Sequence, residues 1–356
     1  MEKNFRTQQI ETLFAERSIT LNGPNACDPQ TEKHLTTERL ISRGLMSLGE
    51  TYVAGDWHCE KLDEFFKQLF YLDQQNSDNK LVSSRHWLHP LKVLFKDRTA
   101  NTNLPSLTNH FDLGNEFFKL LLDSQLNYSA GYWRASETLE DAQQAKHALI
   151  CGKLRIRPGM RVLDLGCGWG SFSRYVATHY KATVLGTTLS SQQAKYAKSV
   201  CRDLPVDIQQ LDFKSVTGTF DRIVCLGMME HLNQAQQAQL MQHASTLLTK
   251  QGLMLIQTIG ANYSDFPTPG WIKHFIFPDL TLPSIAEVGK TSEKHFVIED
   301  WHNLGTDYGK TMQVWLSNLN HHWPAIQALG FDDRFKRLWE FYLNLCCGAF
   351  HARVLQ

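Results

Sequence analysis

The chain has 356 residues, 42% of which are hydrophobic, and its 36 Lys and Arg residues equal its 36 Asp and Glu residues in number. At about 150 residues per domain, this length predicts two folded domains rather than one small module. The zero net charge argues against a protein that neutralises a nucleic-acid backbone, because such proteins carry a net basic surface. We therefore expect no nucleic-acid partner.

The cysteines and the N-terminal sequence indicate the compartment. The eight cysteines form no C-x-x-C pair and no His/Cys cluster at zinc-ligand spacing, so we expect neither a metal site nor a disulfide framework. A reducing cytoplasm fits them best. The N-terminus has no apolar stretch before a small-residue cleavage site, and no apolar run approaches the roughly 18 residues that span a bilayer. Any membrane contact is expected to be peripheral.

Residues 1–95 are predicted to form a smaller, mainly helical N-terminal domain. Apolar residues recur at mostly helical spacing over residues 5–19 and more clearly over residues 62–70. A polar loop is expected at residues 74–80, and the domain boundary between residues 81 and 109. This domain could control access to a ligand site or form a dimerisation surface, and the sequence leaves both roles open.

The segment 85–98 interleaves basic residues with aromatic and aliphatic ones around a single acid. Such a segment could rest on an anionic membrane surface. It could equally be a linker helix packed on its own protein, because long basic side chains commonly border apolar surfaces. Both interpretations stay open at this point.

From Met160 onward, short apolar runs alternate with polar helical segments. Strands are expected at residues 161–165, 183–187, 220–226 and 253–258, with helices at residues 190–200 and 234–248. Strands that alternate with helices predict parallel β-α-β units with helices on both faces of the sheet. The predicted fold class is α/β, a doubly wound Rossmann-like sheet within a catalytic domain over residues 96–356.

A glycine-rich turn follows the first of these strands. It contains Asp164, Gly166, Cys167, Gly168 and Gly170, in the spacing G-x-G-x-G. Glycines permit close approach of a ligand and unusual backbone angles. A carboxylate at the strand end repels a pyrophosphate but attracts a cationic amino-acid group. The turn therefore predicts a site for S-adenosylmethionine.

Two further segments are expected to complete this cofactor site. The second strand ends in hydroxyl and amide side chains, among them Thr188 and Gln193, which can hydrogen-bond a ribose in place of the usual acid. Asp212 and Phe213 stand in the turn before the next strand. They would contact adenine through a carboxylate hydrogen bond and a ring face, although an ordinary surface turn is the alternative.

At this point the sequence resembles the cyclopropane-fatty-acyl-phospholipid synthase family, which includes the mycolic acid cyclopropane synthases. The resemblance spans nearly the whole chain. The segments that carry it are HFDLGN (110–115), YSAGYW (128–133), VLDLGCGWG (162–170), GMMEH (227–231), IFP (276–278), EDWHN (299–303), DY (307–308) and NLCCGAF (344–350), with GETY (49–52) and GDW (55–57) in the N-terminal part.

The resemblance implies a class I S-adenosylmethionine methyltransferase with lipid-binding insertions. It implies transfer of the cofactor's methyl group to the cis double bond of an acyl chain of a membrane phospholipid, and ring closure to a cyclopropane after proton loss. Tyr128 and Ser129 would contact the cofactor. The enzyme would be cytoplasmic and peripheral to the inner face of the membrane. Its N-terminal domain, residues 1–95, would serve as a lipid gate or as the surface of a homodimer.

In this family the base that removes the proton is thought to be a bound bicarbonate. By resemblance, Glu230, the backbone of Ile259 and Tyr308 match three of its ligands. Two positions depart from the family pattern, because Ala130 replaces a cysteine and Gln257 replaces a histidine. Glutamine can donate through its amide but cannot carry positive charge, so bicarbonate binding is in question at these positions.

Cys346 matches the family's C-terminal active-site cysteine. Methyl transfer to an alkene needs no thiol nucleophile, so a structural or pocket-lining role is favoured. Two alternatives to cyclopropane formation stay open. An altered bicarbonate site would give a methyl- or methylene-branched chain, and loss of turnover would leave a non-catalytic lipid-binding module.

Overall fold

A computed structural model describes residues 12–31, 40, 42–71 and 113–356. The chain divides into two compact units: residues 1–110, 265–278 and 308–356 form the first, and residues 111–264 and 279–307 the second. The predicted loop at 74–80, the basic segment at 85–98 and the whole predicted boundary region at 81–109 lie outside the described residues. The division into domains 1–95 and 96–356 stays a prediction.

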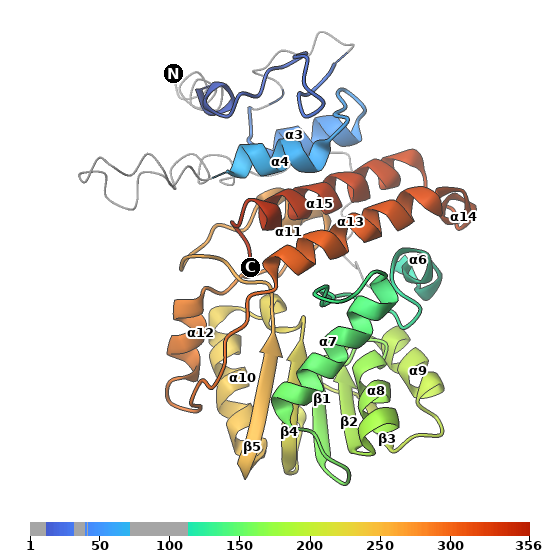
Figure 1. The fold of residues 1–356 in the computed structure, drawn as a ribbon, viewed down its shortest axis with the longest axis vertical. Helices are drawn as coiled ribbons and strands as arrows, with labels where there is room; N and C mark the ends of the chain where they lie inside the picture. Colours follow the sequence, from blue (N-terminus) through green and yellow to red (C-terminus); the bar gives the residue numbers. More distant parts are fainter. Residues whose placement is uncertain (1–11, 32–39, 41, 72–112) are drawn as a thin grey trace, which may run out of the picture. The chain divides into compact units, whose positions relative to one another are not determined.

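The second unit is built on one parallel sheet of five strands (Figure 1). Their order is β3-β2-β1-β4-β5. The strands are β1 (Arg161–Leu165), β2 (Thr183–Thr188), β3 (Val206–Gln210), β4 (Phe220–Leu226) and β5 (Leu248–Gln257). The order reverses between β1 and β4, and in open α/β sheets ligands bind beyond the carboxyl ends of the strands at such a point. The predicted doubly wound α/β class is confirmed.

Helices cover both faces of this sheet. The helices of the second unit are α6 (Asn115–Leu121), α7 (Leu139–Leu154), α8 (Ser171–Tyr180), α9 (Ser191–Val200), α10 (Gln234–Leu247) and α12 (Ile285–Ser292), with the short 3-10 helices η2 (Phe213–Ser215) and η3 (Met229–His231). Buried residues of α7 and α8 pack with Val162 and Val224, whereas those of α10 pack with Leu163 and Ile223. Neighbouring residues of one strand therefore face opposite layers.

Most predicted elements of the sheet agree with the structure, with one omission and one displaced boundary. β3 was not among the expected strands, because Ile208 is its only buried residue and no apolar run marks it. β5 begins at Leu248, earlier than the expected residue 253, and the preceding helix ends at Leu247.

The first unit is helical in its described part. Its helices are α3 (Leu45–Val53), α4 (Leu62–Phe70), α11 (Gly270–Phe275), α14 (Trp323–Ala328), α15 (Asp333–His351) and the residues of α13 (Gly305–His321) from Tyr308 onward. α15 packs against α3 and α4, and its Phe341 ring lies 5.1 Å from Phe66 and 4.6 Å from Trp271. Helices from both ends of the chain thus share one aromatic core.

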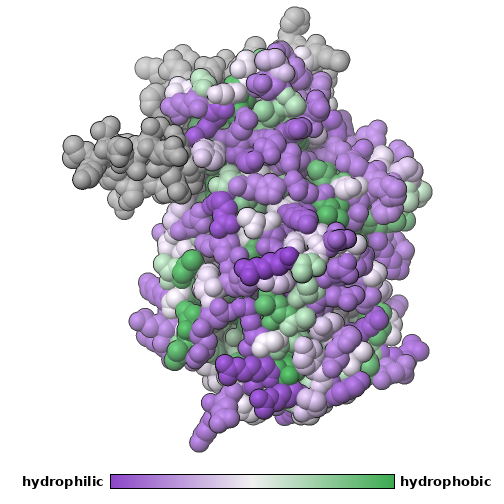
Figure 2. Space-filling view, viewed as in Figure 1, coloured by the Kyte–Doolittle hydropathy of each residue, from purple (hydrophilic) through white to green (hydrophobic). Residues whose placement is uncertain are grey.

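The surface of the described residues mixes polar and apolar side chains. Figure 2 shows hydrophobic residues scattered among hydrophilic ones on the face that it displays. Large hydrophobic side chains are exposed at a few positions, among them Val297, Ile298 and Trp301 in one segment and Leu329 elsewhere. Within the described ranges, no helix is both long and apolar enough to cross a membrane.

Candidate active site

The glycine-rich turn lies between β1 and α8. Gly166, Gly168 and Gly170 have φ values of 74°, 55° and 82°, in the left-handed region that favours glycine. A Cβ atom at Gly166 would lie 3.1 Å from the Cβ of Met228, which follows β4. At Gly168 a Cβ atom would meet nothing within 4 Å. The turn therefore holds its backbone close to the end of β4 and leaves open space at its centre.

Asp164 is a buried carboxylate at the end of β1. Only 1% of the residue is exposed, and its Oδ2 accepts a hydrogen bond of 2.7 Å from Ser173 Oγ on α8. Burial raises the pKa of Asp164 to about 6, while the Ser173 hydrogen bonds and the positive charge of Lys146 oppose this shift. The carboxylate is therefore ionised near neutral pH, as a ligand for a cationic group must be.

Lys146 and Gln143 of α7 hold the loop that carries Ser129. Lys146 Nζ donates to Ser129 Oγ at 3.0 Å, and Gln143 Nε2 donates to the Ser129 carbonyl at 2.9 Å. Lys146 is 1% exposed, and burial lowers its pKa to about 8, although Asp123 and Asp164 oppose this shift. Sequence reasoning missed both residues. The available signal was a pair of polar residues three positions apart on the apolar face of a helix.

Tyr128, the residue before Ser129, belongs to an aromatic cluster with Phe118 and Trp169. The Phe118 ring of α6 lies 5.6 Å from the Tyr128 ring and 4.9 Å from the Trp169 ring. Trp169 Nε1 donates to Asn115 Oδ1 at 2.8 Å, which joins the glycine turn to the start of α6. Phe118 and Trp169 were not among the predicted site residues, although both lie in or beside segments that carry the resemblance.

The remaining residues predicted for the cofactor follow β2 and β3. Thr188 Oγ1 donates to Gln193 Oε1 at 2.8 Å, so these two side chains form one polar pair. Asp212 caps η2 by accepting from the Lys214 backbone N–H at 2.9 Å. Phe213 is buried in the core cluster beneath α10, and the Lys214 ammonium lies 5.6 Å from its ring centre. Their contacts with a cofactor stay predictions.

Glu230 lies in η3, just after β4, and is 5% exposed. Thr258 Oγ1 donates to its Oε2 at 2.9 Å, and the Ile259 backbone N–H also donates to the carboxylate. Burial raises the pKa of Glu230, while His231 and these hydrogen bonds lower it less strongly. The structure thus brings Glu230 and Ile259 together, as the resemblance implied.

Ala130 and Gln257, the two positions that depart from the family pattern, also lie together. Gln257 Nε2 approaches the Ala130 backbone carbonyl at 3.5 Å. Gln257 Oε1 is a buried acceptor for which the described residues supply no hydrogen-bond donor. A buried acceptor without a donor is costly, so a ligand with an acidic O–H suits this position.

Tyr308 and Cys346 belong to the first unit, whereas the other predicted catalytic residues belong to the second. The Tyr308 ring stacks on Phe350 with centroids 4.7 Å apart and planes at 27°. Cys346 is partly exposed at the residue level, and burial of its thiol raises the pKa. A protonated thiol is a poor nucleophile, in line with the favoured pocket-lining role. Their place beside Glu230 stays a prediction.

Comparison with known proteins identifies the family. The family model described as mycolic acid cyclopropane synthetase matches residues 98–356. The cyclopropane-fatty-acyl-phospholipid synthase of Escherichia coli strain K12 is 38% identical over 348 residues, which are 97% of this chain and 90% of that protein.

Two solved structures agree with this match. They are the cyclopropane synthase MmaA2 from Mycobacterium tuberculosis and the mycolic acid cyclopropane synthase CmaA1 complexed with SAH and CTAB. Each has a TM-score of 0.65 and 29% identity, and each match covers 69% of this chain and 93% of the other. With the cofactor turn and the Glu230 cluster, these findings establish that the chain belongs to the cyclopropane synthase family of S-adenosylmethionine-dependent methyltransferases.

Proposed function

We propose that this enzyme transfers the methyl group of S-adenosylmethionine to the cis double bond of an unsaturated phospholipid acyl chain, and that a cyclopropane ring closes after proton loss. The observation that carries the proposal is the 38% identity to the Escherichia coli synthase over 97% of this chain. The match covers nearly the whole chain, so it includes both predicted domains.

The residues at the ends of β1 and β2 fit the cofactor. Asp164 would bind the ammonium group of the methionine part, and the backbone of the glycine turn would lie against it. Thr188 and Gln193 would bind the ribose hydroxyls, with Asp212 and Phe213 near the adenine. S-adenosylmethionine supplies an electrophilic methyl group. The alkene is a weak nucleophile, so the aromatic rings of Tyr128 and Trp169 would serve to orient the reactants and exclude water.

The residues after β4 and β5 fit a bicarbonate ion as the base. Burial raises the pKa of Glu230, so its carboxyl can share a proton with a bound anion. The unpartnered Gln257 Oε1 would accept the O–H of bicarbonate, a role that needs no positive charge. Ala130 leaves space, and Tyr308 would donate its phenolic hydrogen. Glutamine would thus replace the family's histidine without loss of the site.

An exposed apolar segment supports attachment to a membrane surface. Val297 is 83% exposed, and Ile298 and Trp301 are exposed beside it. Lys294 precedes them in the sequence. The segment also contains two acids, Glu299 and Asp300, and an ion pair with Lys153 neutralises the charge of Asp300. Tryptophan and exposed aliphatic side chains with a neighbouring lysine suit the interface of an anionic bilayer. We place the enzyme peripherally, at the cytoplasmic face.

Flotation with vesicles tests this attachment. Val297→Ser combined with Ile298→Ser should reduce binding to vesicles of anionic phospholipid at least about tenfold, because each buried aliphatic side chain contributes about 1.5–3 kcal/mol. Leu329→Ser removes an exposed apolar residue elsewhere and serves as the matched control. Equal vesicle binding by the wild type, the double variant and Leu329→Ser would show that this segment is not the membrane-binding surface.

The homodimer that the sequence leaves open is tested separately. Light scattering of the purified wild-type enzyme measures its mass in solution and so shows whether it is a monomer or a dimer.

Methyl transfer itself is tested with labelled cofactor. The purified enzyme is incubated with methyl-labelled S-adenosylmethionine and vesicles of unsaturated phospholipid, with and without added bicarbonate. We expect label in the acyl chains and a higher rate with bicarbonate. Lipid that binds the enzyme but gains no label would favour the non-catalytic module, and a rate indifferent to bicarbonate would remove the proposed base.

A further inference from the structure

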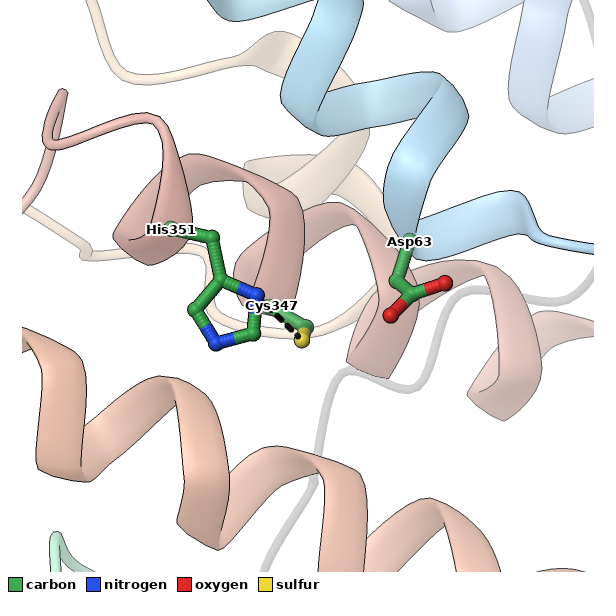
Figure 3. Close-up of side chains that lie close together, drawn as sticks. All are labelled: Asp63, Cys347 and His351. Carbon is green, nitrogen blue, oxygen red and sulfur yellow. Dashed lines mark hydrogen bonds between the residues drawn. The ribbon is translucent and has the colours of Figure 1, made fainter. Parts of the chain in front are cut away.

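Three metal-ligating side chains meet in the first unit, outside the predicted catalytic set. They are Asp63 of α4 and Cys347 and His351 of α15, and one ligand atom of each lies within 4.8 Å of the others (Figure 3). Cys347 Sγ lies 3.6 Å from His351 Nδ1. Gln313 Nε2 donates to Asp63 Oδ2 at 3.3 Å. The group therefore combines one sulfur, one nitrogen and one oxygen ligand with a supporting amide.

Two features of α4 and α15 bring the three side chains close together. Cys347 and His351 are four residues apart, so they project from the same face of α15. Close packing then brings in Asp63. A Cβ atom at Gly348 would lie 2.4 Å from Phe66 Cβ and 2.8 Å from the Asp63 carbonyl, so α15 and α4 approach at a distance that only glycine permits.

Gly309 of α13 gives room for the histidine. A Cβ atom there would lie 2.6 Å from His351 Nε2, and the Gly309 carbonyl accepts a weak hydrogen bond from Cys347 Sγ at 3.7 Å. The imidazole is thus confined by the α13 backbone on one side and directs Nδ1 towards the thiol. Its freedom to turn away from Cys347 is limited.

We propose that Asp63, Cys347 and His351 bind a zinc-class divalent cation that clamps α4 to α15. Zinc takes thiolate sulfur, imidazole nitrogen and carboxylate oxygen at about 2.0–2.3 Å, which places the ligand atoms roughly 3.5 Å apart in a tetrahedron. The observed separations need only a small contraction of flexible side chains. A fourth position is left for water, so the affinity should be below that of a four-ligand structural site.

Charge balance supports a divalent cation. The cation forms the metal–sulfur bond as the S–H bond breaks, and one proton passes to the buffer. The thiolate and the Asp63 carboxylate then neutralise the two positive charges, and His351 binds in its neutral form.

Cobalt(II) spectroscopy of the full-length, chelator-treated enzyme tests the site. We expect one equivalent of cobalt to give a thiolate-to-metal charge-transfer band, zinc to displace it, and each bound zinc to release about one proton at neutral pH. Zinc should also raise the Tm, because a ligand that binds only the folded state stabilises it. The absence of a stoichiometric band would overturn the proposal.

Variants assign the ligands. Cys347→Ser should abolish the charge-transfer band, and His351→Gln and Asp63→Asn should weaken cobalt binding at least about tenfold. Cys346→Ser removes the adjacent cysteine and should leave the band unchanged. A band that survives Cys347→Ser, or that disappears with Cys346→Ser, would contradict the assignment. If Cys347→Ser does not fold, the two near-isosteric variants at Asp63 and His351 decide the question.

Discussion

Asp164 and Glu230 are two buried carboxylates at the ends of the neighbouring strands β1 and β4, and their surroundings differ in charge. Asp164 faces the Lys146 ammonium and the Ser173 hydroxyl. Glu230 is held mainly by the Thr258 hydroxyl and the Ile259 backbone N–H. Burial raises both pKa values, but a buried lysine helps to keep Asp164 ionised. One position thus suits a cationic ligand and the other a shared proton.

The largest effect is expected at Glu230. Glu230→Gln removes the group that shares a proton with the base, so kcat should fall at least about a hundredfold. The affinity for S-adenosylmethionine, measured by calorimetry, should stay unchanged. Glu137→Gln alters an exposed carboxylate and serves as the control. Near-normal turnover of Glu230→Gln would show that the carboxylate is only structural.

Asp164 should control cofactor affinity instead. Asp164→Asn should weaken S-adenosylmethionine binding by about 10- to 100-fold, because a hydrogen bond to a charged group contributes about 1.5–3 kcal/mol. The wild-type affinity should fall as the pH drops below about 6, where the carboxyl takes up a proton. The variant should show no such fall. A wild-type affinity that is flat from pH 5 to 7 would contradict this role.

Lys146 should set the pH at which Asp164 acts. Lys146→Met removes the positive charge, so the pKa of Asp164 should rise, and the loss of cofactor affinity should begin at a pH about one unit higher. Lys153→Met, on the same helix, provides the control. An unchanged pH profile would mean that Lys146 serves only to hold the loop at Ser129.

The lowered pKa of Lys146 should also make the free energy of unfolding depend on pH. Its folded-state pKa of about 8 lies below the ordinary value of 10.5, so the folded protein binds fewer protons than the unfolded chain between these values. The free energy of unfolding should therefore gain a favourable contribution as the pH rises from about 8 to about 10.5. Denaturation of wild type and Lys146→Met across this range should show that contribution only in the wild type.

The smallest effect is expected where the chain departs from its family. Gln257→His restores a side chain that can carry positive charge, so the KM for bicarbonate should fall by a few-fold, about 1 kcal/mol of added anion binding. Assays over a bicarbonate titration measure it. A variant with weaker bicarbonate dependence than wild type would show that Gln257 does not face the anion.

Site residues could be predicted from the sequence where they directly follow a strand that the sequence also predicts. Asp164 and its glycines follow a buried apolar run, and the resemblance placed Glu230 and Ile259 on successive strand ends, where the structure joins them through the carboxylate. Edge strand β3 escaped prediction because only Ile208 on it is buried. Lys146 was not predicted as a site residue because its contact with Ser129 depends on how α7 packs against a loop.

The group formed by Asp63, Cys347 and His351 also depends on contacts between segments that are far apart in the sequence. The expectation of no metal site rested on the absence of a C-x-x-C pair or a larger His/Cys cluster, and Cys347 with His351 supplies only two ligands. Asp63 lies near one end of the chain and Cys347 near the other, and close packing at Gly348 brings their helices together. Such a juxtaposition is a property of the packed helices and cannot be found from spacing along the chain.

Ring closure is measured by the proton NMR spectrum of the fatty acids recovered from unsaturated phospholipid after reaction with enzyme, S-adenosylmethionine and bicarbonate. Ring closure predicts upfield resonances of cyclopropane ring protons and a matching loss of vinyl protons. Vinyl protons lost without ring signals, with methyl-branch or methylene signals in their place, would contradict ring closure at this site.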